Sequence, residues 1–220
     1  MTVAAVLVAA GSGFRLGADV PKAFVAVAGR PLLEHAHARF AAHPRIATCV
    51  VVAPADRIDD AAAVAPGATV VAGGATRQES VAAGLAALGD DVDTVLVHDV
   101  ARAFVPAEVI DRVLDALADG VDAAIPVLPV TDTVKQVDDD NVVVATIDRT
   151  QLVAVQTPQA FRRAALANAH AHAADSSATD DALLVESDGG VVTVVKGDED
   201  AFKITHARDL VLAEAVIARG

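Results

Sequence analysis

The chain has 220 residues, of which 54% are hydrophobic, and its 17 basic and 30 acidic residues give a net charge of −13. This length and composition suit a single domain with a sizeable core, and they exclude a disordered chain. The acidic balance excludes a general nucleic-acid binder, because a phosphate backbone requires a basic surface, whereas a small phosphorylated ligand needs only a few local cations. The one cysteine excludes an intrachain disulfide and a cysteine-based zinc site.

No targeting segment is visible near the start of the sequence. The first basic residue is Arg15, and the apolar run at residues 3–10 is too short to span a bilayer. We therefore expect a cytoplasmic protein with no membrane partner.

Apolar, β-branched runs alternate with helical patterns up to residue 130. Such near-continuous runs are typical of strands in a parallel sheet that is covered on both faces. The alternation predicts a Rossmann-like, doubly wound α/β fold with a mostly parallel sheet and helices on both faces. The predicted strands are residues 3–10, 48–53, 69–72, 94–97 and 123–127, and the predicted helices are residues 32–42, 55–64, 77–88 and 107–118. Ligands bind at the carboxyl ends of the strands in such sheets, so the loops after strands are the expected site.

A predicted β-hairpin interrupts this rhythm. Residues 133–137 alternate, residues 138–141 form a polar turn, and residues 142–146 are again β-rich. Because an isolated two-stranded hairpin is only marginally stable, we expect residues 133–155 to pack on another subunit. A strand at 153–155, a helix at 162–173, a short helix at 181–187, a strand at 191–195 and a helix at 207–219 follow, so residues 1–220 are expected to form one domain with an inserted arm.

The loop after the first predicted strand carries the strongest functional signal. Its glycines let backbone N–H groups approach a phosphate, and its two cations suit phosphate oxygens. The loop residues are Ala9, Ala10, Gly11, Ser12 and Gly13, followed by Arg15 and Lys22. The alternative is an ordinary glycine turn with two surface cations. A dinucleotide fingerprint fails because Leu16 occupies the place of its third glycine, and the Gly-Lys-Ser/Thr triplet of a Walker loop is absent from the sequence.

Two further loops follow predicted strands. Residues 73–80 include Gly74, Ala75 and Ser80, and Thr76 with Glu79 predicts a helix capping box that leaves a helix N-terminus facing the loop. The alternative for this segment is a capped turn without a ligand.

Asp99 ends the strand predicted at residues 94–97, where a carboxylate is well placed to hold a divalent cation bound to phosphates. The alternative is a structural aspartate paired with Arg102. His98 is expected to be a near-core histidine. The pairs His35/His37 and His170/His172 are not read as metal sites, because a spacing of two places them on different helix faces.

Taken together, these segments resemble the 2-C-methyl-D-erythritol 4-phosphate cytidylyltransferases, which convert methylerythritol phosphate and CTP into the CDP-methylerythritol of non-mevalonate isoprenoid synthesis. The resemblance runs through nearly the whole chain, in order, at residues 9–22, 73–80, 97–102, 131–135, 148–149, 156–161, 179–181 and 203–205.

The resemblance implies a role for each matching position. Residues 9–13 and Arg15 would cradle the CTP phosphates with Lys22 beside the α-phosphate, and Gly74, Ala75 and Ser80 would surround the cytosine. Asp99 would lie near the sugar and a Mg²⁺ ion. Thr133, Arg149, Thr179 and Lys203 would bind the methylerythritol phosphate, and Arg15, Lys22, Arg149 and Lys203 would be the catalytic cations. The hairpin would be the dimerisation arm of a homodimer, with part of the substrate site supplied by the partner chain.

Two positions depart from the family pattern. Ala75 stands where relatives often carry a polar or acidic side chain, so a base contact there would come from the backbone. Ala103 stands where relatives usually have proline, so that loop is expected to be less rigid than in those relatives.

The implied reaction is in-line attack of a phosphate-monoester oxygen on the α-phosphorus of CTP with loss of pyrophosphate. A monoester is already largely dianionic at neutral pH, so no general base is required. Another acceptor, above all ribitol 5-phosphate, remains as an alternative. A dinucleotide-binding oxidoreductase is disfavoured by the glycine spacing, and a non-catalytic nucleotide-binding module is disfavoured by Arg15, Lys22 and Asp99.

Overall fold

The computed structural model describes residues 1–11, 20–118, 120–173 and 178–219. These residues form an eight-stranded sheet in the order β10-β7-β11-β6-β1-β4-β5, with β12 also paired to β7. The strands are β1 (Thr2–Val8), β4 (Thr48–Ala53), β5 (Thr69–Ala72), β6 (Val92–Asp99), β7 (Ala123–Pro129), β10 (Val153–Val155), β11 (Gln159–Arg162) and β12 (Val192–Lys196). The pairs among β6, β1, β4 and β5 are parallel, as is the β7–β12 pair, so the predicted mostly parallel sheet is confirmed.

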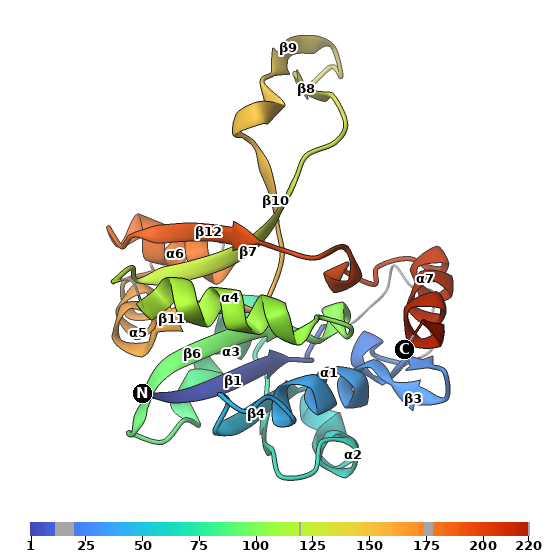
Figure 1. The fold of residues 1–220 in the computed structure, drawn as a ribbon, viewed down its shortest axis with the longest axis vertical. Coiled ribbons are helices and arrows are strands. Elements are labelled where there is room, and N and C mark those ends of the chain that lie inside the picture. The colour runs from blue at the N-terminus through green and yellow to red at the C-terminus, as the bar shows by residue number, and fades with distance from the viewer. Residues whose placement is uncertain (12–19, 119, 174–177, 220) are drawn as a thin grey trace.

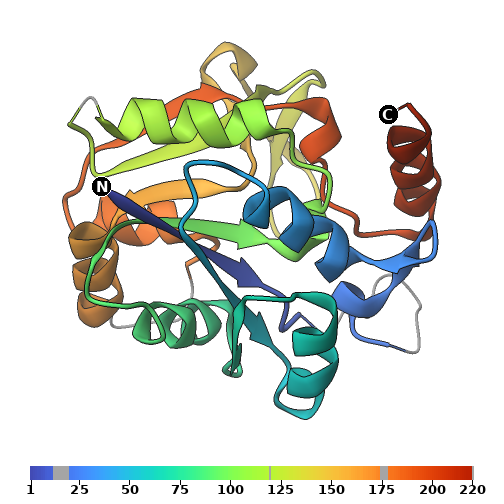
Figure 2. The same cartoon turned by 60° about the horizontal axis from the view of Figure 1, so that its bottom comes forward.

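Helices cover both faces of the sheet, because successive residues of a buried strand point to opposite faces. In β1, Val3, Ala5 and Leu7 belong to one apolar core, and Ala4 and Val6 belong to the other. The first core is closed by α1 (Leu32–Ala41), α2 (Ile58–Val64), α4 (Ala107–Ala118) and α7 (Ala207–Ala218), and the second by α3 (Arg77–Ala86), α5 (Arg163–His172) and α6 (Asp181–Ser187). Figure 2 shows α4 on one side of the sheet and α3 on the other.

One glycine decides how closely α3 approaches the sheet. A Cβ atom on Gly84 would lie 2.5 Å from Cγ1 of Val6 and 3.0 Å from Cγ2 of Val52. The helix therefore packs against β1 and β4 at a distance that only glycine permits, which brings its N-terminus to the edge of the sheet.

The structure differs from the sequence prediction in the middle of the sheet. Strand β11 was not predicted, and it runs antiparallel to both β6 and β7. Its four residues neither alternate nor form an apolar run, and its pairing comes from the two neighbouring strands. A two-residue pair, β2 (Ala26–Val27) with β3 (Arg30–Pro31), was also not predicted. The predicted helix at 55–64 begins as the 3₁₀ turn η3 (Ala55–Arg57) before α2.

The chain between β7 and β10 forms an arm that protrudes from the body of the protein (Figure 1). It contains β8 (Val134–Val137) paired antiparallel with β9 (Val143–Ile147), followed by the 3₁₀ turn η5 (Arg149–Gln151). Asp138 Oδ1 closes the turn by accepting hydrogen bonds from the backbone N–H groups of Asp140 and Val142. The side chains of Val142, Val143 and Val144 are exposed. Within the described residues, the helices are too short or too polar to cross a membrane.

Candidate active site

The loops after β1, β5 and β6 enclose one side of a pocket of about 520 Å³. These loops lie together because β6, β1, β4 and β5 are parallel and adjacent in this order, so that their carboxyl ends lie at one edge of the sheet. Nine of the residues predicted for the site line this pocket: Ala9, Ala10, Gly11, Lys22, Gly74, Ala75, Ser80, Asp99 and Lys203.

The wall formed by residues 73–80 is held by the predicted capping box, which the structure confirms. Thr76 Oγ1 accepts a hydrogen bond from the Glu79 N–H, and the Glu79 carboxylate accepts one from the Thr76 N–H. Ser80 Oγ accepts from the Gly74 N–H at 3.2 Å, and the Ala75 N–H donates to Glu79 Oε2 at 2.6 Å. The backbone of this wall is therefore fixed before any ligand binds. Because the Ala75 N–H already donates to Glu79, the group of Ala75 that could hydrogen-bond to a nucleotide base is its carbonyl.

Small residues let the loops after β1 and β5 approach each other closely beside the pocket. A Cβ atom on Gly73 would lie 2.6 Å from Cβ of Ala10 and 2.8 Å from Oγ of Ser80. The Ala9 N–H donates to the Val52 carbonyl, and the Gly73 N–H donates to the Ala53 carbonyl, so both loops continue the sheet for one more residue. The loop after β5 therefore lies against the Ala10 side chain of the loop after β1, and both loops are hydrogen-bonded to β4.

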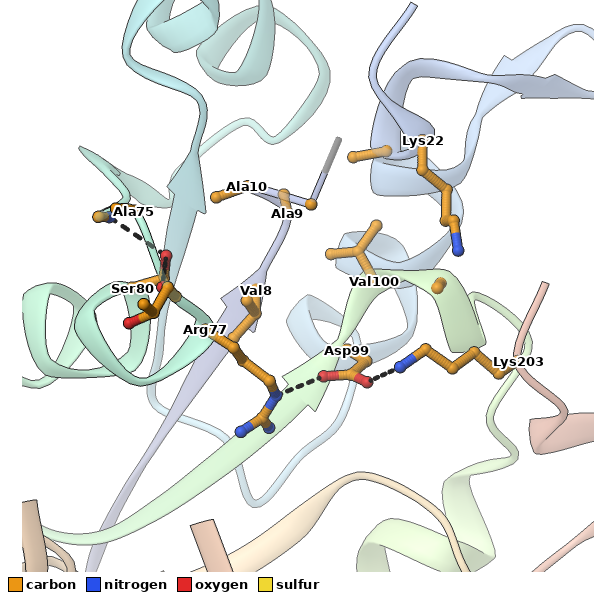
Figure 3. Close-up of a pocket in the computed structure, with 15 residues that line it drawn as sticks. Val8, Ala9, Ala10, Lys22, Ala75, Arg77, Ser80, Asp99, Val100 and Lys203 are labelled. Carbon is orange, nitrogen blue, oxygen red and sulfur yellow. Dashed lines mark hydrogen bonds and ion pairs between the residues drawn. The ribbon is translucent and has the colours of Figure 1, made fainter. Parts of the chain in front are cut away.

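Asp99, the last residue of β6, lies at the centre of the site (Figure 3). Its Oδ2 accepts from Lys203 Nζ at 2.7 Å, and its Oδ1 accepts from Arg77 Nε at 3.3 Å. Burial opposes ionisation of this carboxyl, but the charges of Arg77 and Lys203 outweigh burial and hold the pKa of Asp99 well below its ordinary value. Asp99 is therefore ionised at neutral pH.

The structural alternative for Asp99, a pair with Arg102, is not what the structure shows. The Arg102 guanidinium donates to the backbone carbonyls of Ala201 at 2.9 Å and Val155 at 3.1 Å. Arg102 thereby ties the loop after β6 to β10 and to the turn before Lys203.

Arg77 is a residue of the site that the sequence analysis missed as an individual position. It is the first residue of α3, lines the pocket, and donates to Asp181 Oδ2 at 2.6 Å as well as to Asp99. Its position in the sequence could have indicated this role, because a cation at a helix N-terminus is unfavourable unless nearby carboxylates compensate its charge. Burial lowers the pKa of Arg77, but Asp181 and Asp99 more than reverse this effect and raise it.

His98 is buried in the core, as predicted, directly below the site. Its Nδ1 lies 3.1 Å from Oγ1 of Thr157, which also accepts a hydrogen bond from the Asp99 N–H at 3.1 Å. Its ring packs against Phe40 with the centroids 4.6 Å apart. Burial lowers the pKa of His98 to about 3, so the ring is neutral and acts as part of the support under Asp99.

The remaining predicted residues are not gathered at this pocket. Thr133 and Arg149 lie on the arm, are exposed, and are not among the residues that line the pocket of their own chain. Thr179 is also exposed and precedes α6, two residues before the Asp181 that contacts Arg77. Ser12, Gly13 and Arg15 lie outside the described residues.

The described lining of the pocket carries a local positive charge in a protein of net charge −13. Three cations, Lys22, Arg77 and Lys203, face one carboxylate, Asp99, which gives 3 − 1 = +2. Figure 3 shows the amines of Lys22 and Lys203 on the same side of the pocket. Phosphate groups are attracted to such a place, and backbone N–H groups of small residues can approach them closely.

Comparison with known proteins identifies the family of the chain. The family model described as 2-C-methyl-D-erythritol 4-phosphate cytidylyltransferase matches residues 3–219. A protein of that name from Streptomyces avermitilis is 50% identical over 98% of this chain and 92% of its own length, and one from Frankia casuarinae is 49% identical over 99% and 82%.

Solved structures give the same result. The 4-diphosphocytidyl-2C-methyl-D-erythritol synthase of Anaerococcus prevotii is 31% identical, with a TM-score of 0.85 over 99% of both chains. The 2-C-methyl-D-erythritol 4-phosphate cytidylyltransferase of Thermus thermophilus is 42% identical, with a TM-score of 0.79 over 100% of both chains. With a family model that spans nearly all of its length and relatives at half identity, this chain belongs to the 2-C-methyl-D-erythritol 4-phosphate cytidylyltransferase family.

Proposed function

We propose that this protein transfers the cytidylyl group of CTP to 2-C-methyl-D-erythritol 4-phosphate and releases pyrophosphate. Membership of the family supports this activity. The observation that carries it is the pocket at the carboxyl ends of β1, β5 and β6, which three cations and one ionised aspartate line in an otherwise acidic protein.

The chemistry requires charge stabilisation rather than proton transfer. A phosphate-monoester oxygen forms a bond to the α-phosphorus of CTP, and the bond from that phosphorus to the bridging oxygen breaks, so that pyrophosphate leaves with the electron pair. The monoester is already largely dianionic at neutral pH. Fixed cations near the α-phosphate oxygens lower the barrier, and we assign this role to Lys22 and Lys203. Arg15 is proposed to bind the outer phosphates.

The nucleotide base is proposed to lie against Gly74, Ala75 and Ser80. Ala10, Gly74 and Ala75 line this part of the pocket, and the capping box holds the backbone of the wall rigid. These features support selection of a pyrimidine over a larger purine.

A magnesium ion is proposed to accompany the nucleotide. Mg²⁺ commonly keeps several waters and takes one or two carboxylates besides the substrate phosphates. Asp99 is the one carboxylate among the described pocket residues and is ionised, so the donor set fits an ion held mainly by the nucleotide. The bound ion would neutralise phosphate charge. Arg77 and Lys203 keep Asp99 ionised and oriented for this contact.

The arm is proposed to form a homodimer in which it reaches the pocket of the other chain. Its valine side chains at residues 142–144 are exposed, and a two-fold dimer is the commonest way to cover such a surface. Thr133 and Arg149 of the partner subunit would then complete the acceptor site. This arrangement gives a function to two polar residues that do not line their own pocket.

The test is a pyrophosphate-release assay with CTP and Mg²⁺ across a panel of acceptors that includes 2-C-methyl-D-erythritol 4-phosphate, ribitol 5-phosphate and erythritol 4-phosphate. We expect release with the first acceptor and little with the others. Lys203→Met should abolish most of the activity. Lys196→Met, which changes another exposed lysine on β12, serves as its matched control. Equal or faster turnover of ribitol 5-phosphate would overturn the acceptor assignment.

A further inference from the structure

Five ionisable side chains form a continuous path from the pocket into the interior. Lys203 Nζ lies 2.7 Å from Asp99, and Arg77 Nε lies 3.3 Å from the same carboxylate. Arg77 Nη1 lies 2.6 Å from Asp181 Oδ2, and His170 Nε2 lies 2.9 Å from Asp181 Oδ1. Figure 3 shows the outer part of this path, from Lys203 through Asp99 to Arg77.

The inner end of the path is deeply buried. The Asp181 side chain is 1% exposed, and that of His170 is 7% exposed, whereas that of Lys203 is 42% exposed. A buried carboxylate is costly unless each oxygen has a partner, and Arg77 and His170 provide one each. Asp181 does not line the pocket, so its influence on the pocket passes through Arg77.

The backbone holds Asp181 rigidly in this place. It is the first residue of α6, whose N-cap Asp180 accepts from the Leu183 N–H at 3.0 Å and from Gln159 Nε2 at 2.8 Å. Ala182 and Val185 bury one side of the helix in the core. The carboxylate is therefore aimed at Arg77 by a helix end that is itself fixed to β11.

We propose that Asp181 is a positioning residue for the proposed cytidylyl transfer, and that it acts by holding Arg77 so that Asp99 remains available to orient Lys203. The inference rests on the proposed function. Asp181 would contact neither substrate, but it would hold the catalytic cation Lys203 in position through Arg77 and Asp99.

The physical reason is a competition for Arg77. The guanidinium makes its shorter contact with Asp181, 2.6 Å against 3.3 Å to Asp99. Without the Asp181 charge, the guanidinium would be drawn toward Asp99, because arginine prefers to engage a carboxylate with two parallel hydrogen bonds. Asp99 would then hold Lys203 less tightly. A long lysine side chain that is 42% exposed loses its fixed position when its contact with Asp99 weakens.

The experiment replaces Asp181 by asparagine, which keeps the shape and removes the charge. Asp188→Asn is the matched control, because Asp188 also pairs with a histidine of α5, His172 at 2.7 Å, but has no link to the pocket. We expect Asp181→Asn to lower kcat about tenfold through misplacement of Lys203, with the thermal unfolding midpoint still well above the assay temperature. The control should stay within about twofold of the wild type.

A second variant separates positioning from a merely structural role. If Asp181 acts through Lys203, then Asp181→Asn should have little further effect on kcat in a Lys203→Met background, because the positioned group is already absent. An independent role would multiply the two losses. Multiplied losses, or a wild-type kcat in Asp181→Asn, would overturn the inference.

Two further outcomes are informative. If Asp181→Asn does not fold, the double variant Arg77→Gln with Asp181→Asn removes one charge of each sign and leaves no unpaired buried charge at this position. Without a guanidinium at position 77, Asp181 has no means of acting on Asp99, so the double variant should fold and keep kcat within about threefold of Arg77→Gln alone. A further loss of about tenfold in kcat in the double variant would overturn the inference. A folded wild-type protein without CTP-dependent pyrophosphate release would instead overturn the proposed function, and the inference with it.

Discussion

His98 should make the protein lose stability as the pH falls below neutral. The side chain is fully buried in β6, between Thr157 and the ring of Phe40. Burial lowers its pKa from 6.5 to about 3. Between these two pH values the side chain therefore stays neutral in the folded protein but is protonated in the unfolded chain. Because the folded-state pKa is the lower one, the stabilisation is present above pH 6.5 and is lost progressively as the pH falls toward 3.

The size of the effect follows from the two pKa values. The slope approaches about 1.4 kcal/mol per pH unit below the unfolded-state pKa, and integration between pH 7 and pH 5 gives a loss of about 2 kcal/mol. This loss is a substantial part of the stability of an ordinary domain, about 5–15 kcal/mol. Asp99 does not interfere in this interval. Its burial is outweighed by Arg77 and Lys203, so its pKa is lowered and its contribution changes only in more acidic solution.

The assay is urea unfolding of the wild type and of His98→Asn at pH 7 and pH 5. Asparagine places an amide near the position of Nδ1, keeps a partner for Thr157, and does not titrate. Its loss of packing against Phe40 is the same at both pH values and cancels in the difference. We expect the wild type to lose about 2 kcal/mol more than the variant between the two pH values. An equal loss in both proteins would refute the reasoning. A pair of measurements above pH 7 should show no difference in slope and serves as the control.

Three further predictions concern the site, the packing and the arm. Lys22→Ala should lower kcat about a hundredfold, because one fixed cation facing the reacting phosphate is lost, and a kcat near that of the wild type would remove Lys22 from the mechanism. Gly84→Ala places a Cβ 2.5 Å from Val6 Cγ1, so urea unfolding should show a loss of about 1–3 kcal/mol, and unchanged stability would contradict the close helix packing. Subunits carrying Arg149→Ala and subunits carrying Lys22→Ala should regain part of the activity when mixed into verified hybrid dimers, and the absence of any gain would place Arg149 outside the partner's site.

Local pattern predicts some elements of this fold to the residue. Strands β4 and β5 and helix α4 occupy the predicted ranges, 48–53, 69–72 and 107–118. Both strands are apolar, β-branched runs followed by a proline or a glycine. In β4, which is buried on both faces, such a run is required. The helix shows its apolar stripe at the period of the α-helix. These signals lie within a few residues of one another, so the sequence carries them without reference to the rest of the chain.

Strand β11 shows where local pattern is insufficient. Residues 159–162 read Gln-Ala-Phe-Arg, which neither alternates nor forms a β-branched apolar run, so it does not predict a strand. The segment becomes a strand because β6 and β7 offer hydrogen-bonding groups on either side of it, with Gln159 opposite Val97 and Ala160 opposite Ala124. The antiparallel strand inside a parallel sheet is therefore a property of the assembled sheet.

The same division holds for the site. The sequence by itself determined that Lys22 and Asp99 follow apolar strands, and the fold rule for such sheets then predicts that they meet at one edge. It could not determine which charges pair. Lys203 meets Asp99 across 104 residues, and Arg77 meets Asp181 across another 104. These pairs depend on which strand ends are neighbours and on where α3 and α6 begin, so only the tertiary structure decided them, because Coulombic contacts follow distance in space and not separation along the chain.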